Sequence, residues 1–369
     1  IVAPFDYPPF DRAAMDGYAV KVQDTYSATK DKPVLLRIAG EVQAGTCHRF
    51  RLVSGNCFSV MTGSKLPEGT DAVIKIEDVE TADSYIKVFF PVKKDENISF
   101  KSEDLSKGKI VIRKGTFIDS AVVMMLAYLG KAKIKVMKQP DVSIVVTGDE
   151  LIEPGNRLSE GKVYDSNSYG LYALVKESGC VPHIFGIAQD KESHLHSVMK
   201  MAIDCDVMLV SGGVSTGKYD LVINVLREMG IKTVFWKVAM KPGKPVFFGK
   251  KDNTLVFGLP GYPVSTYLSF CALVKVALKK MLGFKNPDHP FVYGILTSDI
   301  RNDGDRTALF RVKVISEKNG NFVYPYHKQK SGMLSSVVET NGLLVVRKGL
   351  SLKTGDLIKC EILRERLLE

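Results

Sequence analysis

The sequence lacks long hydrophobic runs, paired cysteine motifs and any visible leader segment. Its most apolar stretch, Ala121 to Leu129, is far shorter than the roughly 20 residues of a membrane span. The six cysteines are scattered without a CxxC pair, so we expect reduced thiols rather than disulfides or a zinc site. The 369 residues show no charged segment followed by an apolar one, as a signal peptide would. We therefore expect a cytoplasmic protein with no membrane attachment.

Two nucleotide-binding motifs are also missing. No GxGxxG follows the first central strand and no GxxxxGK[ST] occurs, which counts against a dinucleotide oxidoreductase and a P-loop NTPase. The net charge of +10 allows an anionic partner, although a basic surface alone can serve solubility. Lysines and arginines form no long run, and no nucleic-acid motif is present, so we expect no nucleic acid partner.

The centre of the chain, residues 136–286, alternates short apolar strands with amphipathic helices. Continuous apolar strands between helices are typical of a mostly parallel sheet covered on both faces. The expected strands are Val142–Val146, Val181–Ile187, Val207–Val210, Thr233–Val238, Val246–Phe248 and Leu255–Phe257. Ser166 is placed to cap the first helix, and Pro263 to begin a last helix that ends near Gly283. The sequence therefore predicts an α/β domain here.

The flanking regions carry short β-like runs between Gly, Pro and Asp turns. This pattern over residues 16–98 and 287–369 is typical of small β domains or barrels. Residues 1–15 and 99–135 would form a connector with one apolar helix, in which Met124 and Met125 are expected to be core residues. A chain of 369 residues exceeds what one core usually fills, so several domains are expected.

Glycines, prolines and charged side chains follow five of the central strands. The carboxyl ends of parallel strands meet at one edge of a sheet, where ligands bind; we call this edge the rim. In strand order, the rim candidates are Glu150; Asp190; the SGGVSTG segment at residues 211–217 with Asp220; Lys237, Lys241 and Lys244; and Pro260, Gly261 and Pro263.

The rim candidates have complementary chemistry. Backbone N–H groups and hydroxyls around Ser211, Gly212, Gly213 and Ser215 can cradle a phosphate before a helix. The lysines add positive charge, and Glu150, Asp190 and Asp220 are hard oxygen ligands suited to Mg²⁺. Each piece alone has a structural explanation, such as a Gly-Gly turn or a solvated carboxylate. Their joint placement indicates an anion and metal site.

The N-terminal β region has weaker candidates. The Asp16-Gly17 pair before a β-like run is interpreted, from spacing alone, as a hairpin turn. Residues 61–69 (MTGSKLPEG) form a turn, or an anion contact through Thr, Ser and Lys. Asp104 is by default a surface carboxylate.

Taken in order, several segments resemble the molybdopterin molybdenumtransferase family, of the MoeA and gephyrin E-domain type. The matching segments are AMDGYAV, VMTGSKLPEGTDAV, SEDLSKG, VVTGDEL, YDSN, SGGVSTGKYD, MKPGKPVFFG and GLPGYPVS. The resemblance implies an elongated four-domain chain: the α/β domain, an inserted N-terminal β domain, a C-terminal β-barrel and the connector. It also implies a homodimer and a reaction in which molybdate enters adenylylated molybdopterin, with Mg²⁺, and AMP is released.

The resemblance implies roles for individual residues. Asp16 and Thr62 would reach the site from the partner subunit, with Asp104 as a third candidate. The family's acidic positions match Glu150, Asp190 and Asp220, and its basic positions match Lys237 and Lys241. Its prolines match Pro260 and Pro263. Two weaker matches in the C-terminal domain are Arg311 and Ser331.

Two departures and two alternatives remain. Tyr262 stands where the family usually has Asn, and Ser99-Phe100-Lys101-Ser102 replaces an arginine-rich approach. One alternative is a molybdopterin adenylyltransferase, against which the flanking β domains argue. The other is a non-enzymatic scaffold, against which the rim residues argue. The adenylyltransferase and apo-molybdoenzymes are the expected transient partners.

Overall fold

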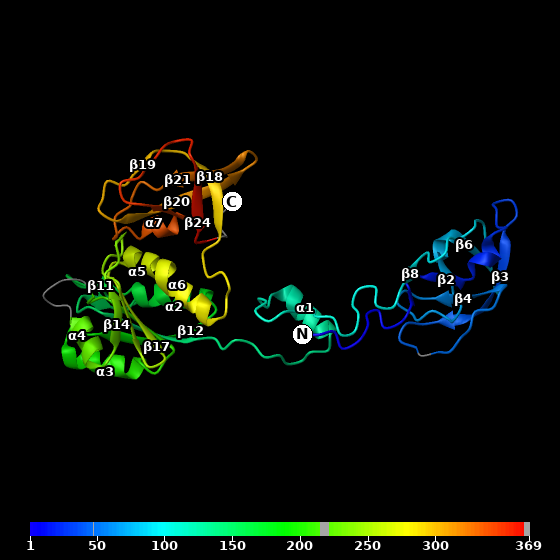
Figure 1. Ribbon diagram of the computed structural model, residues 1–369, viewed down its shortest axis with the longest axis horizontal. Helices are drawn as coiled ribbons and strands as arrows, with labels where there is room; N and C mark the ends of the chain where they lie inside the picture. The colour runs from blue at the N-terminus through cyan, green and yellow to red at the C-terminus, as the bar shows by residue number, and fades with distance from the viewer. Residues whose placement is uncertain (47, 215–220, 365–369) are drawn as a thin grey trace. The chain divides into compact units, whose positions relative to one another are not determined.

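The computed structural model describes residues 1–46, 48–214 and 221–364, and the chain divides into two compact units. These are Ile1–Ile134 and Lys135–Glu369 (Figure 1, blue to cyan and green to red). No helix in the described residues combines the length and apolar character needed to span a bilayer. Cys57, Cys180, Cys205, Cys271 and Cys360 are not joined in disulfides among the described residues, and Cys47 lies outside them.

The first unit is built on a six-stranded mixed sheet with the order β5-β2-β4-β3-β7-β6. Its apolar side chains fill one cluster on each face. The sheet strands are β2 (Gly17–Val20), β3 (Val34–Val42), β4 (Asn56–Val60), β5 (Ala72–Lys75), β6 (Val79–Ala82) and β7 (Tyr85–Val88). Outside it, β1 (Arg12–Ala13) pairs with β8 (Ile98–Ser99), and two short 3₁₀ turns are η1 (Val22–Thr25) and η2 (Ile76–Asp78).

The hairpin expected at Asp16-Gly17 is wrong. β2 pairs with β4 and β5, whereas β1 pairs with β8, so the two strands around this dipeptide do not form a hairpin. Gly17 is required for another reason: a Cβ there would lie 1.8 Å from the carbonyl oxygen of Ile74. Close backbone packing in the sheet selects the glycine.

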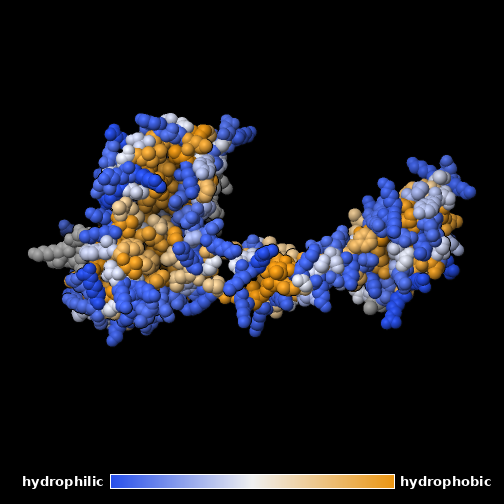
Figure 2. Space-filling model, in the orientation of Figure 1, coloured by the Kyte–Doolittle hydropathy of each residue, from blue (hydrophilic) through white to orange (hydrophobic). Residues whose placement is uncertain are grey.

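Helix α1 (Ser120–Tyr128) begins at Asp119, whose carboxylate accepts a hydrogen bond from the Val122 N–H. The expectation that both of its methionines are core residues is wrong for Met124, which is 74% exposed. Only Leu126 of the helix is buried, because the helix is apolar on all sides and the unit covers one of them. Figure 2 shows the resulting apolar surface around α1.

The second unit contains a six-stranded sheet with the order β12-β9-β13-β17-β16-β14. The first four strands are parallel, and β16 is antiparallel to both of its neighbours, so β14 again runs parallel to β17. The predicted mostly parallel sheet is confirmed. Its strands are β9 (Asp141–Thr147), β12 (Val181–Ala188), β13 (Val207–Ser211), β14 (Lys232–Trp236), β16 (Phe247–Lys251) and β17 (Thr254–Leu259).

Helices cover both faces of this sheet. Two buried clusters, one for each face, contain the apolar side chains of α2, α5 and α6 and of α3 and α4 respectively. The helices are α2 (Asn167–Glu177), α3 (Glu192–Ala202), α4 (Leu221–Glu228), α5 (Pro263–Ser269) and α6 (Lys275–Met281). The last helix begins at Pro263 as predicted, but a π-helical turn, η3 (Phe270–Val274), divides it.

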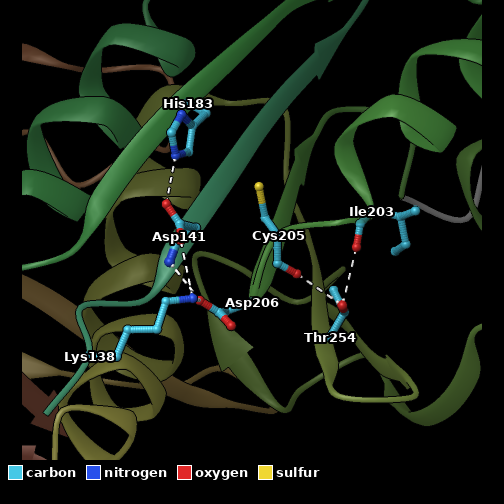
Figure 3. Close-up of polar contacts among 7 residues, drawn as sticks. All are labelled: Lys138, Asp141, His183, Ile203, Cys205, Asp206 and Thr254. Carbon is cyan, nitrogen blue, oxygen red and sulfur yellow. Dashed lines mark hydrogen bonds and ion pairs between the residues drawn. The ribbon is translucent and has the colours of Figure 1, made fainter.

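Charged side chains tie the amino ends of the parallel strands together (Figure 3). Lys138 Nζ lies 3.0 Å from Asp206 and 3.3 Å from Asp141, and Asp141 also faces His183 at 2.9 Å. His183 and Lys138 hold the pKa of the Asp141 carboxyl below its usual value. This exposed network lies at the edge of the sheet opposite the rim.

The C-terminal part of the second unit is a closed ring of five strands, in which β20 pairs with both β21 and β22. The expected β-barrel is confirmed. Its strands are β18 (Phe291–Leu296), β20 (Thr307–Glu317), β21 (Gly320–Pro325), β22 (Gly342–Val346) and β24 (Leu357–Ile362), with α7 (Ser335–Val338) beside them. Minor pairings are β10 (Leu151–Ile152) with β11 (Val163–Tyr164), β19 (Ile300–Arg301) with β23 (Ser351–Leu352), and β15 (Met240–Lys241) with β20.

Candidate active site

The strand ends predicted to form the rim meet in the structure. The Gly212 N–H donates to the Leu259 carbonyl at 3.1 Å, and Ser211 Oγ donates to the Pro260 carbonyl at 3.1 Å. The Cα of Gly212 lies 3.6 Å from the position that a Cβ of Gly261 would take. The segments after β13 and β17 therefore lie in contact, and Pro263 begins α5 directly behind them.

The segment at residues 211–214, which we call the glycine loop, needs its two glycines. Gly212 and Gly213 have φ of 101° and 61°, in the left-handed region. A Cβ on Gly212 would lie 2.4 Å from the Thr147 carbonyl oxygen, and one on Gly213 would lie 2.5 Å from Val222 Cγ2. The loop is thus packed backbone to backbone against the end of β9. Ser215 and Asp220, predicted for phosphate and metal binding, lie outside the described residues.

Two of the predicted metal-binding carboxylates lie at neighbouring strand ends. Thr147 Oγ1 donates to Asp190 Oδ1 at 2.5 Å, and the Asp190 N–H donates to Asp149 Oδ1 at 3.1 Å. The Glu150 carboxylate folds back over Gly148 in the turn after β9: a Cβ on Gly148 would lie 2.6 Å from Glu150 Oε2. Glu150 and Asp190 are exposed hard oxygen donors, which fits a divalent cation. No group of three or more His, Cys, Asp or Glu side chains forms a metal site within the described residues.

Asn167 is a rim residue that sequence reasoning missed. Its Nδ2 donates to Ser211 Oγ at 3.0 Å and to the Gly261 carbonyl at 2.8 Å, joining the start of α2 to two strand ends. The only sequence feature that pointed to Asn167 is its place at the end of the YDSN segment, one of the segments that resemble the family. The predicted cap, Ser166, makes no capping bond; Asp165 Oδ1 accepts from the Ser168 N–H instead.

The three predicted lysines follow β14 but separate from one another. Lys237, with φ of 76°, places its Nζ 4.3 Å from the centre of the Trp236 ring. The Trp236 Nε1–H donates to the Val214 carbonyl at 3.2 Å, which connects this strand end to the glycine loop. Lys241 lies in β15 and pairs with Ala308 of the barrel, whereas the Lys244 carbonyl accepts from the Val238 and Val246 N–H groups. Lys237 is therefore connected to the glycine loop through the Trp236 ring.

Arg311 of β20 is a buried cation. It is 1% exposed, its Nη2 donates to the Lys328 carbonyl at 3.0 Å, and Nε and Nη1 have no hydrogen-bond partner among the described residues. Burial lowers the pKa of the guanidinium to about 10, so it stays charged at neutral pH. Two free donors on a buried cation fit an anionic ligand.

The loop that carries Ser331 extends from Arg311 to the rim. Gln329 Nε2 donates to the Arg311 carbonyl at 2.9 Å. A Cβ on Gly332 would lie 4.0 Å from Tyr262 Cδ1, at the end of β17. Tyr262 itself is 67% exposed. The Tyr262 ring therefore lies between the rim and the barrel loop.

In the first unit, the structure brings together Asp16 and Thr62, two residues that the family resemblance names as site candidates. Asp16 Oδ1 accepts hydrogen bonds from the Thr62 N–H at 2.6 Å and from Thr62 Oγ1 at 2.8 Å. These bonds lower the pKa of the Asp16 carboxyl. Asp104 makes a backbone bond to the Tyr7 carbonyl at 3.1 Å, and no interaction in the described residues joins its side chain to the pair.

Comparison with known proteins accounts for nearly the whole chain. Three family models match: the MoeA N-terminal region (domain I and II) over residues 1–130, the probable molybdopterin binding domain over 143–280, and the MoeA C-terminal region (domain IV) over 293–363. A molybdopterin molybdenumtransferase of Haemophilus influenzae is 34% identical over 354 residues, which cover 94% of this chain and 86% of the relative. The chain belongs to the molybdopterin molybdenumtransferase family.

Further relatives agree, and the expected family is confirmed. A molybdopterin molybdenumtransferase of Bacillus subtilis is 30% identical over 371 residues, covering 99% of this chain and 86% of the relative. The solved molybdopterin biosynthesis MoeA protein of Pyrococcus horikoshii superposes with a TM-score of 0.83 at 32% identity, covering 99% of this chain and 90% of that one. The family is one of transferases in molybdenum cofactor biosynthesis, which assigns this chain to that process.

Proposed function

We propose that the rim catalyses Mg²⁺-dependent insertion of molybdate into adenylylated molybdopterin, with release of AMP. The observation that carries the proposal is the convergence of the glycine loop, Glu150 and Asp190 at the carboxyl ends of β9, β12 and β13. Backbone N–H groups beside carboxylates suit a phosphate bridged by a cation, because the carboxylates alone would repel the phosphate.

Each part of the rim has its own task in this proposal. The glycine loop and Lys237 bind and orient the phosphates, and the buried Arg311 with Ser331 receives an oxyanion. Lys241 and Lys244 add positive charge between sheet and barrel. Magnesium, held by Glu150 and Asp190 together with Asp220, would supply Lewis-acid polarisation of the phosphoanhydride. Pro260, Gly261 and Pro263 fix the path of the last strand end.

The proposal includes a homodimer in which Asp16 and Thr62, with Asp104 as a further candidate, reach the rim of the partner subunit. The exposed face of α1 supports an interface between copies: Val123 is 54% exposed and Met124 is 74% exposed (Figure 2). Contiguous apolar surface of this kind is typical of protein contacts. We further propose a cytoplasmic location, transient contact with the adenylyltransferase and with apo-molybdoenzymes, and the four-domain division expected from the sequence.

The decisive experiment supplies adenylylated molybdopterin, Mg²⁺ and molybdate to the purified chain and measures AMP release. We expect molybdate-dependent release that D190N lowers by at least about a hundredfold, as removal of an electrostatic contact in an active site does. Asp252 is a matched control: it lies in a turn with φ of 50°, which Asn also tolerates, so D252N should act as wild type. Adenylylation of molybdopterin from ATP, without molybdate-dependent AMP release, would favour the adenylyltransferase instead.

A further inference from the structure

Trp236, the only tryptophan of the chain, lies at the carboxyl end of β14 between two parts of the proposed site. Its Nε1–H donates to the Val214 carbonyl of the glycine loop at 3.2 Å. The face of its ring lies 4.3 Å from Lys237 Nζ. A single side chain thus contacts both the backbone cradle and the nearest cation.

The contact with Lys237 depends on an unusual backbone. Lys237 has φ of 76°, in the left-handed region that residues with a Cβ rarely adopt. Its N–H is held by the Val246 carbonyl at 2.8 Å, which helps to fix that conformation. With this backbone conformation the Lys237 side chain lies over the ring of Trp236, the residue before it. Among aromatic side chains, Trp makes the strongest cation–π contacts.

The contact with the glycine loop is equally specific. Val214 is 1% exposed, and a Cβ on Gly258 of β17 would lie 2.7 Å from Val214 Cγ1. The side chain of Val214 is therefore fixed by packing, and its carbonyl by the indole N–H. Trp236 holds the far end of a loop whose near end is fixed by Gly212 against β9.

We propose that Trp236 is a positioning residue for the reaction: it holds the Lys237 ammonium and the glycine loop in register, so that both address the same anion. This inference rests on the proposed function, because it takes these two groups to bind the phosphate of the substrate. The competing explanation is that Trp236 only fills space, since it packs against the buried cluster of α3 and α4.

Three substitutions separate these explanations. W236F keeps a ring that packs but removes the N–H donor, W236L removes the donor and the ring face, and K237M removes the cation. Arg227 offers a matched control, because its guanidinium approaches the same ring from α4 at the longer distance of 5.8 Å. R227Q should therefore leave anion binding unchanged.

The experiment measures AMP binding by calorimetry and molybdate-dependent AMP release for each variant of the full chain. We expect W236F to weaken AMP binding about three- to tenfold, the effect of one lost hydrogen bond. W236L should weaken it further, by about threefold more, through loss of the ring face. That additional loss should vanish in the K237M background, which a space-filling role would not produce. K237M should also shift the fluorescence of the single tryptophan.

The outcomes distinguish the inference from the function on which it rests. If W236F and W236L bind AMP as wild type does while K237M binds weakly, or if the additional loss persists without Lys237, the positioning role is wrong and the function stands. If the wild-type chain binds no AMP and releases none, the proposed function itself fails. Thermal melting identifies a W236L chain that does not fold, in which case W236F and the K237M fluorescence decide.

Discussion

At the scale of single residues, the Asp16 and Thr62 pair is defined by two short hydrogen bonds to one carboxylate oxygen. Because those bonds favour the charged form, they lower the pKa of Asp16. Their contribution to stability is present above the unfolded pKa of about 3.9 and is lost as the pH falls through the lower folded value. Asp16 is therefore ionised throughout the neutral range in which it would meet the substrate.

Thr62 can be changed to test this account. T62V removes the hydroxyl and keeps the backbone N–H, which is the larger of the two causes, so the pKa of Asp16 should rise but stay below its ordinary value. Carbon-13 NMR titration of the aspartate carboxyls measures it, with D16N to assign the signal. T62S keeps the hydroxyl and should keep the wild-type pKa. Equal titration of T62V and wild type would contradict the assigned bond.

Asn167 gives a second prediction at this scale. Because its Nδ2 joins two strand ends, N167A should lower the free energy of unfolding by about 1 kcal/mol and weaken AMP binding about three- to tenfold. N167D should be worse, since a carboxylate would face the Gly261 carbonyl without a donor. Urea unfolding and calorimetry check both, and an N167D chain equal to wild type would show that the two bonds do not matter.

The sequence predicted the rim residues but not the residues that hold them. Strand ends of a parallel sheet converge by geometry, so Glu150, Asp190 and the glycines could be placed from the order of elements alone. Asn167 and Trp236 act through contacts with segments 44 and 22 residues away, which no local pattern contains. Met124 was misplaced because an apolar helix does not show which of its faces the fold covers.

At the scale of elements, the glycine loop shows how backbone geometry limits sequence. G212A would place a Cβ 2.4 Å from the Thr147 carbonyl oxygen at φ of 101°, so we expect a loss of roughly 2 kcal/mol or more in the free energy of unfolding, and loss of AMP binding. Gly170, inside α2 with no atom within 4 Å of its added Cβ, is the control. G170A should stabilise the chain by about 0.5–1 kcal/mol. Denaturant unfolding measures the free energy of unfolding of both variants. Similar values for G212A and G170A would contradict the prediction.

The sequence located the strands, because the hydrophobic pattern determines where a strand lies in the chain. It did not predict which strands pair, or which of them runs antiparallel. The strand runs were located, but that β16 lies antiparallel between β14 and β17 depends on which edges meet in space. The π-helical turn at Phe270–Val274 was likewise hidden, because its sequence is apolar like the helices around it. One carbonyl of that turn, that of Cys271, faces His289 Nε2 at 2.9 Å. A contact across 18 residues thus accompanies the irregular turn.

At the scale of the whole molecule, the candidate site residues are divided between the two units. Asp16 and Thr62 belong to residues 1–134, whereas the rim belongs to residues 135–369. The proposed homodimer reunites them by joining the first unit of one subunit to the rim of the other. If each site combines residues of two subunits, two different inactive variants can complement each other in a mixed dimer, which a site within one chain would not allow.

Two inactive variants should restore activity when their subunits exchange. In a heterodimer of D16N and D190N, one site combines the intact rim of the D16N subunit with the intact Asp16 of the D190N subunit, and the other site carries both changes. Random exchange makes half of the dimers heterodimers with one intact site each, so about a quarter of wild-type AMP release should return. E150Q mixed with D190N is the control, because both lie on the rim and no exchange can build an intact site. Mass spectrometry verifies that the subunits exchange. If activity does not then recover in the mixture of D16N and D190N, either Asp16 acts with the rim of its own chain or Asp16 is not part of the same site as the rim.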